Sequence, residues 1–170
     1  MTPALDRLVT ARLDLRRPVA ADFPAYAAYC ASDRAQFVGG PFDAARAFEK
    51  FAAMAGHWDL RGFGRYVMTQ EGRAIGHVGP LQLLATDPPE MTWTLWDGAL
   101  EGQGLAREAA RAVTAHLLED LGWSDLILRI AADNTGSRLL AERLGAVAVD
   151  APAPAWMPDA VTYRLTRVMA

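Results

Sequence analysis

Apolar and polar positions alternate with a period of two at the start of the chain. Near residues 8–16, Leu13 and Leu15 are separated by one polar position, a pattern that is typical of a half-buried strand. The period then lengthens to that of a helix. It predicts a first helix after the N-cap candidate Asp22 and up to Ala31. The chain is therefore expected to open with a strand followed by a helix.

A second helix is predicted from the N-cap candidate Asp43 to about Trp58. Its apolar face is expected to carry Phe48, Phe51, Ala52 and Ala55. The stretch Gly62–Phe63–Gly64 then breaks the helical pattern, because glycine is a strong interruption of regular structure. Two consecutive helices thus precede the next strand.

The middle of the chain returns to strand-like alternation and predicts an antiparallel meander. Its strands are expected at 66–69, 74–84 and 90–96. A tight turn at Glu71–Gly72 joins the first two of them, since glycine accepts the backbone geometry of a hairpin turn. The third strand leads into the second half of the chain.

The second half alternates between helices and strands. A long apolar stripe predicts a helix over 105–121. The other expected elements are a strand at 125–131, a helix from Asn134 that closes at Gly145, and strands at 147–149 and 161–165 joined by the loop 151–159. The predicted order is β-α-α-β-β-β-α-β-α-β-β, in a single domain over 1–170.

Composition narrows the class of protein. The chain has 170 residues, 52% of them apolar, which is enough for the core of one domain. A net charge of −3 argues against an electrostatic nucleic-acid binder, and the apolar runs are too short for a membrane span. The single Cys30 cannot form an internal disulfide, and no Cys/His group has metal-ligand spacing. With no signal-peptide pattern, we expect a cytoplasmic, soluble protein without a metal.

The stretch Glu101–Ala110 is the strongest candidate for a binding motif. Gly102 and Gly104 sit between the third meander strand and the long helix. Glycines let the backbone N–H groups approach a ligand closely, and a helix N-terminus favours an anion, above all a phosphate. The stretch lacks the Lys-Ser/Thr of a P-loop and the third glycine of a dinucleotide fingerprint. The alternative interpretation is an ordinary turn before a helix.

These elements and motifs together resemble the GNAT-superfamily N-acetyltransferases, and within them the RimJ/RimL-type branch of ribosomal-protein alanine acetyltransferases. The resemblance is carried by 13–18, 61–64, 102–106, Asn134-x-x-Ser137 and Leu144–Gly145. It implies an α/β (α+β) fold with one mixed, mostly antiparallel sheet of six to seven strands and about four helices on both faces. The family's phosphate motif begins with Arg or Gln, whereas this chain has Glu101. We therefore expect Glu101 to point outward.

The resemblance also implies acetyl-CoA as co-substrate and places it. In the family the pantetheine arm pairs with the strand before the motif, which requires that strand to splay from its neighbour, usually with a β-bulge. The implied cofactor-binding residues are Thr94, Leu95, Trp96, Gly102, Gln103, Gly104, Leu105, Ala106, Arg107, Asn134 and Ser137. For Asn134 the alternative is a purely structural helix N-cap.

The implied chemistry is direct attack of an amine on the thioester in a ternary complex. Glu90 matches the glutamate that related enzymes place on the acceptor side, and its alternative is a solvated acid after a Pro-Pro loop. Many family members use a tyrosine as general acid seven residues after the asparagine, but this chain has Ala141 there. Ser137 is the implied substitute, and its alternative is a backbone-bonding serine early in a helix.

The sequence does not identify the acceptor amine. A protein N-terminus, a polyamine, an amino acid and an antibiotic are all compatible with it. A non-catalytic acyl-CoA-binding module is the alternative function. Neither a nucleic acid nor a membrane is expected as a partner, and a homodimer is possible. Trp156 lies in the Pro- and Ala-rich loop 151–159, and we expect it to form a dimer contact or a lid over the acceptor cleft. Trp58, Trp93 and Tyr66 are expected to be structural, and the alternative is that they line an acceptor pocket.

Overall fold

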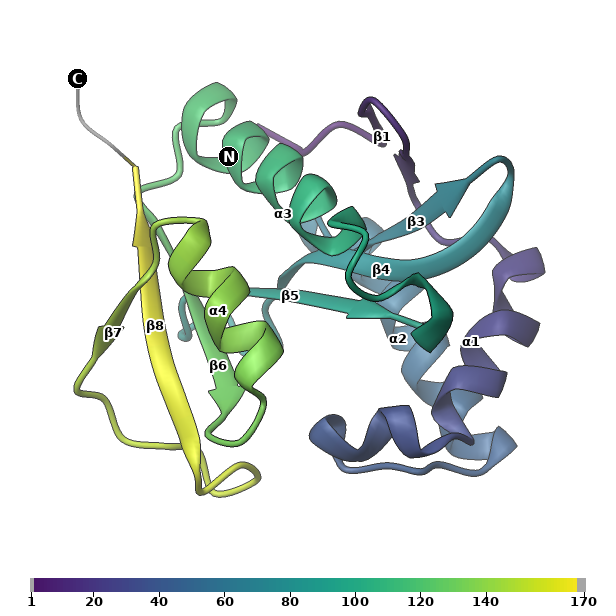
Figure 1. The fold of residues 1–170 in the computed structure, drawn as a ribbon. Coiled ribbons are helices and arrows are strands. Elements are labelled where there is room, and N and C mark those ends of the chain that lie inside the picture. Colours follow the sequence, from purple (N-terminus) through teal and green to yellow (C-terminus); the bar gives the residue numbers. More distant parts are fainter. Residues whose placement is uncertain (1, 168–170) are drawn as a thin grey trace.

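The computed structural model describes residues 2–167, which form one mixed sheet flanked by helices (Figure 1). The sheet order is β1-β2-β3-β4-β5-β6-β8-β7, and every neighbouring pair is antiparallel except β5 and β6. The strands are β1 (Arg7–Val9), β2 (Asp14–Arg16), β3 (Tyr66–Gln70), β4 (Arg73–Leu81), β5 (Glu90–Leu95), β6 (Asp125–Ala131), β7 (Val147–Val149) and β8 (Ala160–Thr166). The sheet has eight strands, so the expected six to seven is a small undercount.

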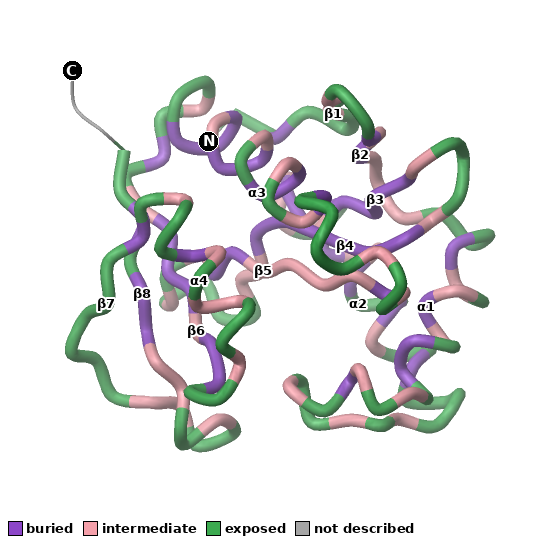
Figure 2. The backbone as a smooth tube through the Cα atoms, viewed as in Figure 1, coloured by how far each residue is buried: buried purple, intermediate pink, exposed green. Residues whose placement is uncertain are grey.

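Four α-helices cover the sheet. They are α1 (Phe23–Cys30), α2 (Ala44–Arg61), α3 (Leu105–Ala115) and α4 (Thr135–Arg143). In Figure 1, α3 and α4 lie in front of the sheet, and α1 and α2 lie behind and beside it. A larger apolar cluster packs α3 against the sheet, and a smaller one packs α1 and α2 against it; Figure 2 shows the buried chain between these layers.

The extra strand arises at the N-terminus. The expected single strand over 8–16 is a hairpin of β1 and β2, because the chain turns where Thr10 N–H donates to the Leu13 carbonyl. The helix α1 begins where predicted, but the Asp22 carboxylate does not cap it. That carboxylate accepts two hydrogen bonds from Arg16, each 2.8 Å long, and is buried. An ion pair between the strand and the helix entry thus replaces the predicted cap.

The helix α2 is longer than predicted, and its buried face is rotated. The Asp43 carboxylate accepts from the Arg46 N–H as a cap should, and the helix ends at Gly62 with φ 75. Phe48 is 59% exposed, against the prediction. The buried positions of the helix are Ala47, Phe51, Met54, His57 and Trp58. An alanine-rich helix leaves the apolar face ambiguous in sequence, and packing against α1 and β3 selects it.

The meander forms as predicted. Glu71 and Gly72 both have positive φ, 51° and 78°, the geometry of a tight hairpin turn. The strand β4 ends at Leu81, short of the predicted residue 84, because the chain leaves the sheet and exposes Leu83 and Leu84. The long helix is likewise divided, since α3 is followed by one π-helical turn over His116–Asp120. The segment Asp33–Val38, between the two predicted helices, is 3-10 helix.

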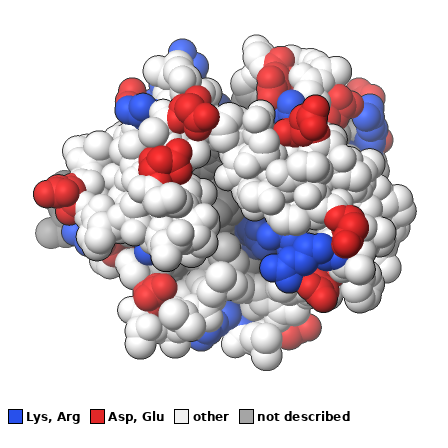
Figure 3. Space-filling view, turned by 90° about the horizontal axis from the view of Figure 1, so that it is seen from below, with Lys and Arg blue, Asp and Glu red and all other residues white. Residues whose placement is uncertain are grey.

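The sheet opens between β5 and β6. The pair is parallel and has a single register position, Glu90 with Ile127, after which the two strands diverge. The predicted splay is therefore present, but no bulge in β5 causes it. The one register shift in the meander lies between β3 and β4, where Ile75 is the extra residue. Seen from below, the surface is hollowed between the two halves of the molecule, and Lys and Arg side chains lie at the edge of the hollow (Figure 3).

Candidate functional site

The glycine stretch forms a tight loop at the start of α3. Gly102 and Gly104 have φ values of 77° and 76°, in the left-handed region that glycine adopts without strain. Gly104 is the N-cap, and the first bond of the helix runs from the Glu108 N–H to its carbonyl. The N–H groups of the first turn before Glu108 therefore have no acceptor within the helix. This is the geometry of an anion site at a helix N-terminus.

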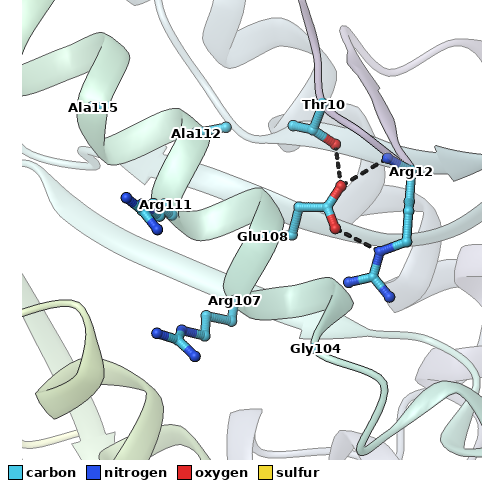
Figure 4. A pocket seen from close by; sticks show the side chains of 8 residues that line it. All are labelled: Thr10, Arg12, Gly104, Arg107, Glu108, Arg111, Ala112 and Ala115. Atoms are coloured by element: carbon cyan, nitrogen blue, oxygen red, sulfur yellow. Dashed lines mark hydrogen bonds and ion pairs between the residues drawn. The ribbon is translucent and has the colours of Figure 1, made fainter.

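A polar cluster fixes the loop to the N-terminal hairpin. The Glu108 carboxylate accepts from the Thr10 hydroxyl at 2.6 Å and from the Arg12 backbone N–H and Nε at 2.8 and 2.6 Å. Arg12 Nη1 also donates to the Gln103 carbonyl at 2.8 Å. Figure 4 shows Glu108 turned toward Thr10 and Arg12. The hairpin thereby holds the glycine loop in place, a role for Arg12 that sequence could not reveal because the partners lie 91 and 96 residues away.

Two arginines project from the same helix beside this cluster and line the same surface hollow. Figure 4 shows Arg107 and Arg111 pointing away from the Glu108 cluster. They are one turn apart, and within residues 2–167 neither has a carboxylate within 4 Å. A surface hollow of ≈ 530 Å³ runs along α3 beside the loop. It is lined by Thr10, Arg12, Gly104, Arg107, Glu108, Arg111, Ala112 and Ala115. Arg107 was a predicted cofactor residue, and Arg111 is an addition from the structure.

The open edge of β5 supplies backbone groups beside the loop. The Trp96 N–H donates to Ile75 on β4, so by the antiparallel alternation Thr94 and Trp96 direct their backbone groups toward β4. Trp93 and Leu95 therefore face the splay. The Leu95 carbonyl accepts from Arg34 Nη2 at 2.9 Å. Of the three strand residues implied for the pantetheine arm, Leu95 is the one at the open edge.

Arg34 also holds the Glu101 side chain in an outward orientation. Its Nη2 lies 2.9 Å from the Glu101 carboxylate, whose side chain is 63% exposed. The acid at the first position of the motif thus points outward, as predicted, and its charge is balanced by a neighbouring guanidinium. An inward carboxylate would repel an anion at the loop.

Asn134 and Ser137 lie at the start of α4, on the other side of the opening between β5 and β6. The Asn134 Oδ1 accepts from the Ser137 N–H at 3.2 Å, so its structural role as N-cap is confirmed. The Trp93 indole N–H donates to the Ser137 hydroxyl oxygen at 3.3 Å, across the opening between β5 and α4. Since the hydroxyl accepts here, its own proton stays available for another acceptor. Trp93 thus has a polar contact with α4 in addition to its apolar packing.

Replacing Ser137 by alanine should have a modest effect on both stability and rate. The variant loses the hydrogen bond from Trp93, so the free energy of unfolding should fall by about 0.5–1.5 kcal/mol. If the hydroxyl protonates the leaving thiolate, kcat should fall most at high pH, where water supplies protons least readily. Chemical denaturation and pH–rate profiles measure the two effects. Ser124→Ala is the matched control, since Ser124 is exposed and its hydroxyl donates only to the neighbouring Asp125 among the described residues.

Glu90 lies at the closed end of the splay and is buried, with 9% of its surface exposed. It is not the solvated acid of the alternative interpretation. Arg129 Nη1 on β6 lies 3.0 Å from its Oε2. Burial raises the pKa of Glu90, and the adjacent Arg129 opposes that shift without cancelling it. Arg129 appears in sequence only as a break in an apolar strand, so its role was missed.

The position of Glu90 separates it from the glycine loop. Met91 packs in the larger apolar cluster and Trp96 in the smaller one, so even-numbered residues of β5 face α1 and α2. Glu90 therefore faces the α1–α2 side, whereas the loop opens at the start of α3 on the other side. A ligand over the loop and a ligand against Glu90 would approach the splay from opposite faces of the sheet.

The remaining candidate, Trp156, is 65% exposed in the loop before β8. Its exposure is as predicted, and its role as dimer contact or lid stays a prediction. Among residues 2–167, no group of three or more His, Cys, Asp or Glu side chains could hold a metal ion. Within the same range no helix is long and apolar enough to cross a membrane.

The fold and the glycine loop at the splayed strands agree with a match to a known family. Residues 12–147 match the family model described as an acetyltransferase (GNAT) domain. The chain belongs to the GNAT acetyltransferase family. It is an acetyl-CoA-dependent N-acetyltransferase, as the sequence predicted. No curated protein matches the chain.

Solved structures share the architecture along nearly the whole chain. An acetyltransferase from Agrobacterium tumefaciens is 33% identical with a TM-score of 0.86, and the match covers 97% of this chain and 96% of that one. An acetyltransferase from Bordetella pertussis assigned to the GNAT family is 27% identical with a TM-score of 0.78, covering 94% and 99%. RimL, a ribosomal L7/L12 α-N-protein acetyltransferase in complex with coenzyme A, is 17% identical with a TM-score of 0.75, covering 94% and 96%. At that identity RimL shows the shared fold alone.

Proposed function

We propose that the protein transfers the acetyl group of acetyl-CoA to a primary amine by direct attack in a ternary complex. The observation that carries this proposal is the placement of two sites on opposite faces of the splay. The glycine loop opens beside α3, and the buried Glu90 faces α1 and α2. The two substrates can therefore be bound together and meet at the open edge of β5.

The residues beside α3 fit the coenzyme. Gly102 and Gly104 carry no side chains, and a Cβ at Gly102 would meet nothing within 4 Å, so the approach to the first-turn N–H groups is open on that side. Arg107 and Arg111 would hold phosphate oxygens from one side of the helix, because guanidinium groups pair well with phosphate. Bound there, the coenzyme supplies an activated acyl group as a thioester.

The coenzyme-site proposal keeps the predicted residues, although of the three on β5 only Leu95 has its backbone groups at the open edge. Backbone N–H groups of the loop and the first turn would hold the pyrophosphate, and the outward groups of β5 would pair with the arm. The residues assigned to it are Thr94, Leu95, Trp96, Gly102, Gln103, Gly104, Leu105, Ala106, Arg107, Asn134 and Ser137. Trp93 joins this set, since its backbone faces the open edge and its indole bonds Ser137.

Glu90 and Ser137 have separate roles in this proposal. An amine must be neutral to attack, and a lysine-type amine has a pKa of about 10.4, so a base is needed at neutral pH. Glu90, with its raised pKa, would take that proton directly or through water. Ser137, which receives a bond from Trp93, would return a proton on the other side of the splay. A thiol has a pKa of about 8.5, so this second transfer helps the rate less.

Release of free thiol from acetyl-CoA tests the proposal. We expect release to depend on an added primary amine and to give one acetylated amine per thiol, by mass spectrometry. A panel should contain peptides with free N-termini, amino acids, polyamines and aminoglycosides. Tight coenzyme binding with no amine-dependent release from any member would instead support a non-catalytic acyl-CoA-binding module.

A further inference from the structure

The α1–α2 side of the splay contains two cations without an acidic partner. Arg65 directly precedes β3, and its backbone is fixed because its carbonyl accepts from the Trp58 indole at 3.1 Å. Lys50 projects from α2, with its Nζ 4.6 Å from the centre of the Phe42 ring. Tyr66 packs in the larger apolar cluster, so Arg65 faces the other side of the sheet, toward α1 and α2. Its Cα lies beside Gly79, which pairs with Thr92 on β5, two residues from Glu90. The charge of Arg65 also acts on Lys50 and on Glu90.

Nothing in the described chain neutralises these two cations. Among residues 2–167, no carboxylate lies within 4 Å of either Arg65 or Lys50, and neither side chain donates a hydrogen bond. The one carboxylate whose charge acts on Arg65 is that of Glu90, which is already held by Arg129. Arg16 and Arg34, which are also partly buried, do have acids: Arg16 pairs with Asp22, and Arg34 pairs with Glu101. Within the same range, Arg61 and Arg138 lack acids but donate hydrogen bonds to other oxygens, which Arg65 does not.

The surrounding phenols cannot supply the missing charge. Tyr26 and Tyr29 of α1 are both buried and lie within reach of the Arg65 charge. Burial raises the pKa of Tyr29 to about 12 and raises that of Tyr26 as well, so both stay neutral at physiological pH. Burial also lowers the pKa of Arg65 and of Lys50, which means that both cations are partly removed from water. An anion that binds beside such desolvated cations stabilises their charged form.

We infer that the acceptor amine carries a carboxylate, which Arg65 binds with support from the Lys50 ammonium. This inference rests on the proposed function and narrows its acceptor. A guanidinium matches a carboxylate with two parallel hydrogen bonds, a geometry that also orients the bound molecule. Figure 3 shows Lys and Arg side chains at the edge of the hollow on this side of the molecule, where an acceptor can enter.

The same arrangement selects against other amines. With its carboxylate on Arg65, the acceptor presents its amine toward Glu90, so opposite charges meet at both ends. A polyamine brings only positive charge toward Arg65 and Lys50, and like charges in a partly desolvated site oppose binding. An aminoglycoside has the same disadvantage. The acceptor class is therefore an amino acid, or a peptide whose first residues are acidic.

Paired substrates test the inference. Each amino acid or acidic peptide is compared with its carboxamide, in the wild type and in Arg65→Leu. For carboxylates we expect the variant to lose roughly 30-fold or more in kcat/KM, mainly through KM, the size expected when one partner of a desolvated charge pair is removed. For carboxamides the loss should stay below about 3-fold. The wild-type to variant ratio of kcat/KM is taken for each acid and for its amide. Comparing these two ratios removes the difference in amine reactivity between acid and amide. Arg65→Lys should recover part of the loss, because it keeps the charge.

A second variant and a control complete the test. Lys50→Met should also lower kcat/KM for the carboxylate acceptors. Arg73→Leu is the control and should leave kcat/KM unchanged for carboxylates and carboxamides, since Arg73 is exposed and pairs with Asp97 on the surface. Thermal melting and coenzyme titration show whether each variant is folded. Equal losses for acids and amides, or a wild-type preference for polyamines, would overturn the inference and leave the proposed function standing. If no amine is acetylated, the proposed function fails, and calorimetry of the N-acetylated acids against wild type and Arg65→Leu still decides whether Arg65 binds a carboxylate.

Discussion

Replacing Glu90 by glutamine should lower kcat about 100-fold for an acceptor amine with a pKa near 10, since a positioned proton transfer contributes roughly that much. Glutamine keeps the size of the side chain and cannot accept the proton. The deficit should shrink as pH rises, because more of the amine is then neutral without help. For a peptide N-terminus, with a pKa of about 7.7–8.0, the deficit should be much smaller. Steady-state thiol release over a range of pH measures both trends.

The ion pair with Arg129 gives this prediction a second test. Burial raises the pKa of Glu90, so kcat/KM of the wild type should fall as pH drops through a value above the ordinary carboxyl range. Arg129 opposes that shift. Arg129→Met removes the opposition, so the acidic limb should move to higher pH, and Glu90→Gln should lose this limb. A pH-independent deficit in Glu90→Gln, with an unmoved limb in Arg129→Met, would show that Glu90 is not the base.

Replacing Gly104 by valine should weaken coenzyme binding roughly 5- to 150-fold. The φ of 76° at Gly104 is accessible to glycine and strained for a β-branched residue. The loop of the variant can relax in the free protein and must return to the strained shape to bind. Strain of this kind amounts to roughly 1–3 kcal/mol, which converts into that range of affinity. Isothermal calorimetry with acetyl-CoA or CoA measures the change.

A hairpin glycine provides the matched control for this substitution. Gly72 has a φ of 78° in the exposed turn between β3 and β4, and a Cβ there would meet nothing within 4 Å. Gly72→Val should therefore bring similar backbone strain and a similar loss of stability, with no loss of coenzyme affinity. Unchanged affinity in Gly104→Val, or an equal loss in both variants, would remove the glycine loop from the binding site.

Local pattern in the sequence was enough for most elements of the fold. The strand β6 has the bounds that its apolar run predicts, and the Glu71–Gly72 turn has the expected positive φ values. The glycine loop could also be predicted, because it depends on residues close together in the chain, and the family and enzyme class followed from short motifs and from the order of the elements. Gly102 and Gly104 are two residues apart, and their backbone freedom is a property of glycine itself. Glu90, at the start of the third meander strand, came from the family resemblance, and its role stays a prediction.

Tertiary structure decided the features that depend on partners far apart in sequence. The apolar face of α2 was ambiguous in an alanine-rich helix until α1 packed against it, and Asp22 binds Arg16 in place of a helix N–H. Arg12 reaches Gln103, Arg34 reaches Glu101, and Arg129 reaches Glu90. The isolation of Arg65 and Lys50 from acids has the same origin. A charge pattern in sequence does not say which ions are paired, because pairing and burial arise only when α1, α2 and the sheet close around the side chains.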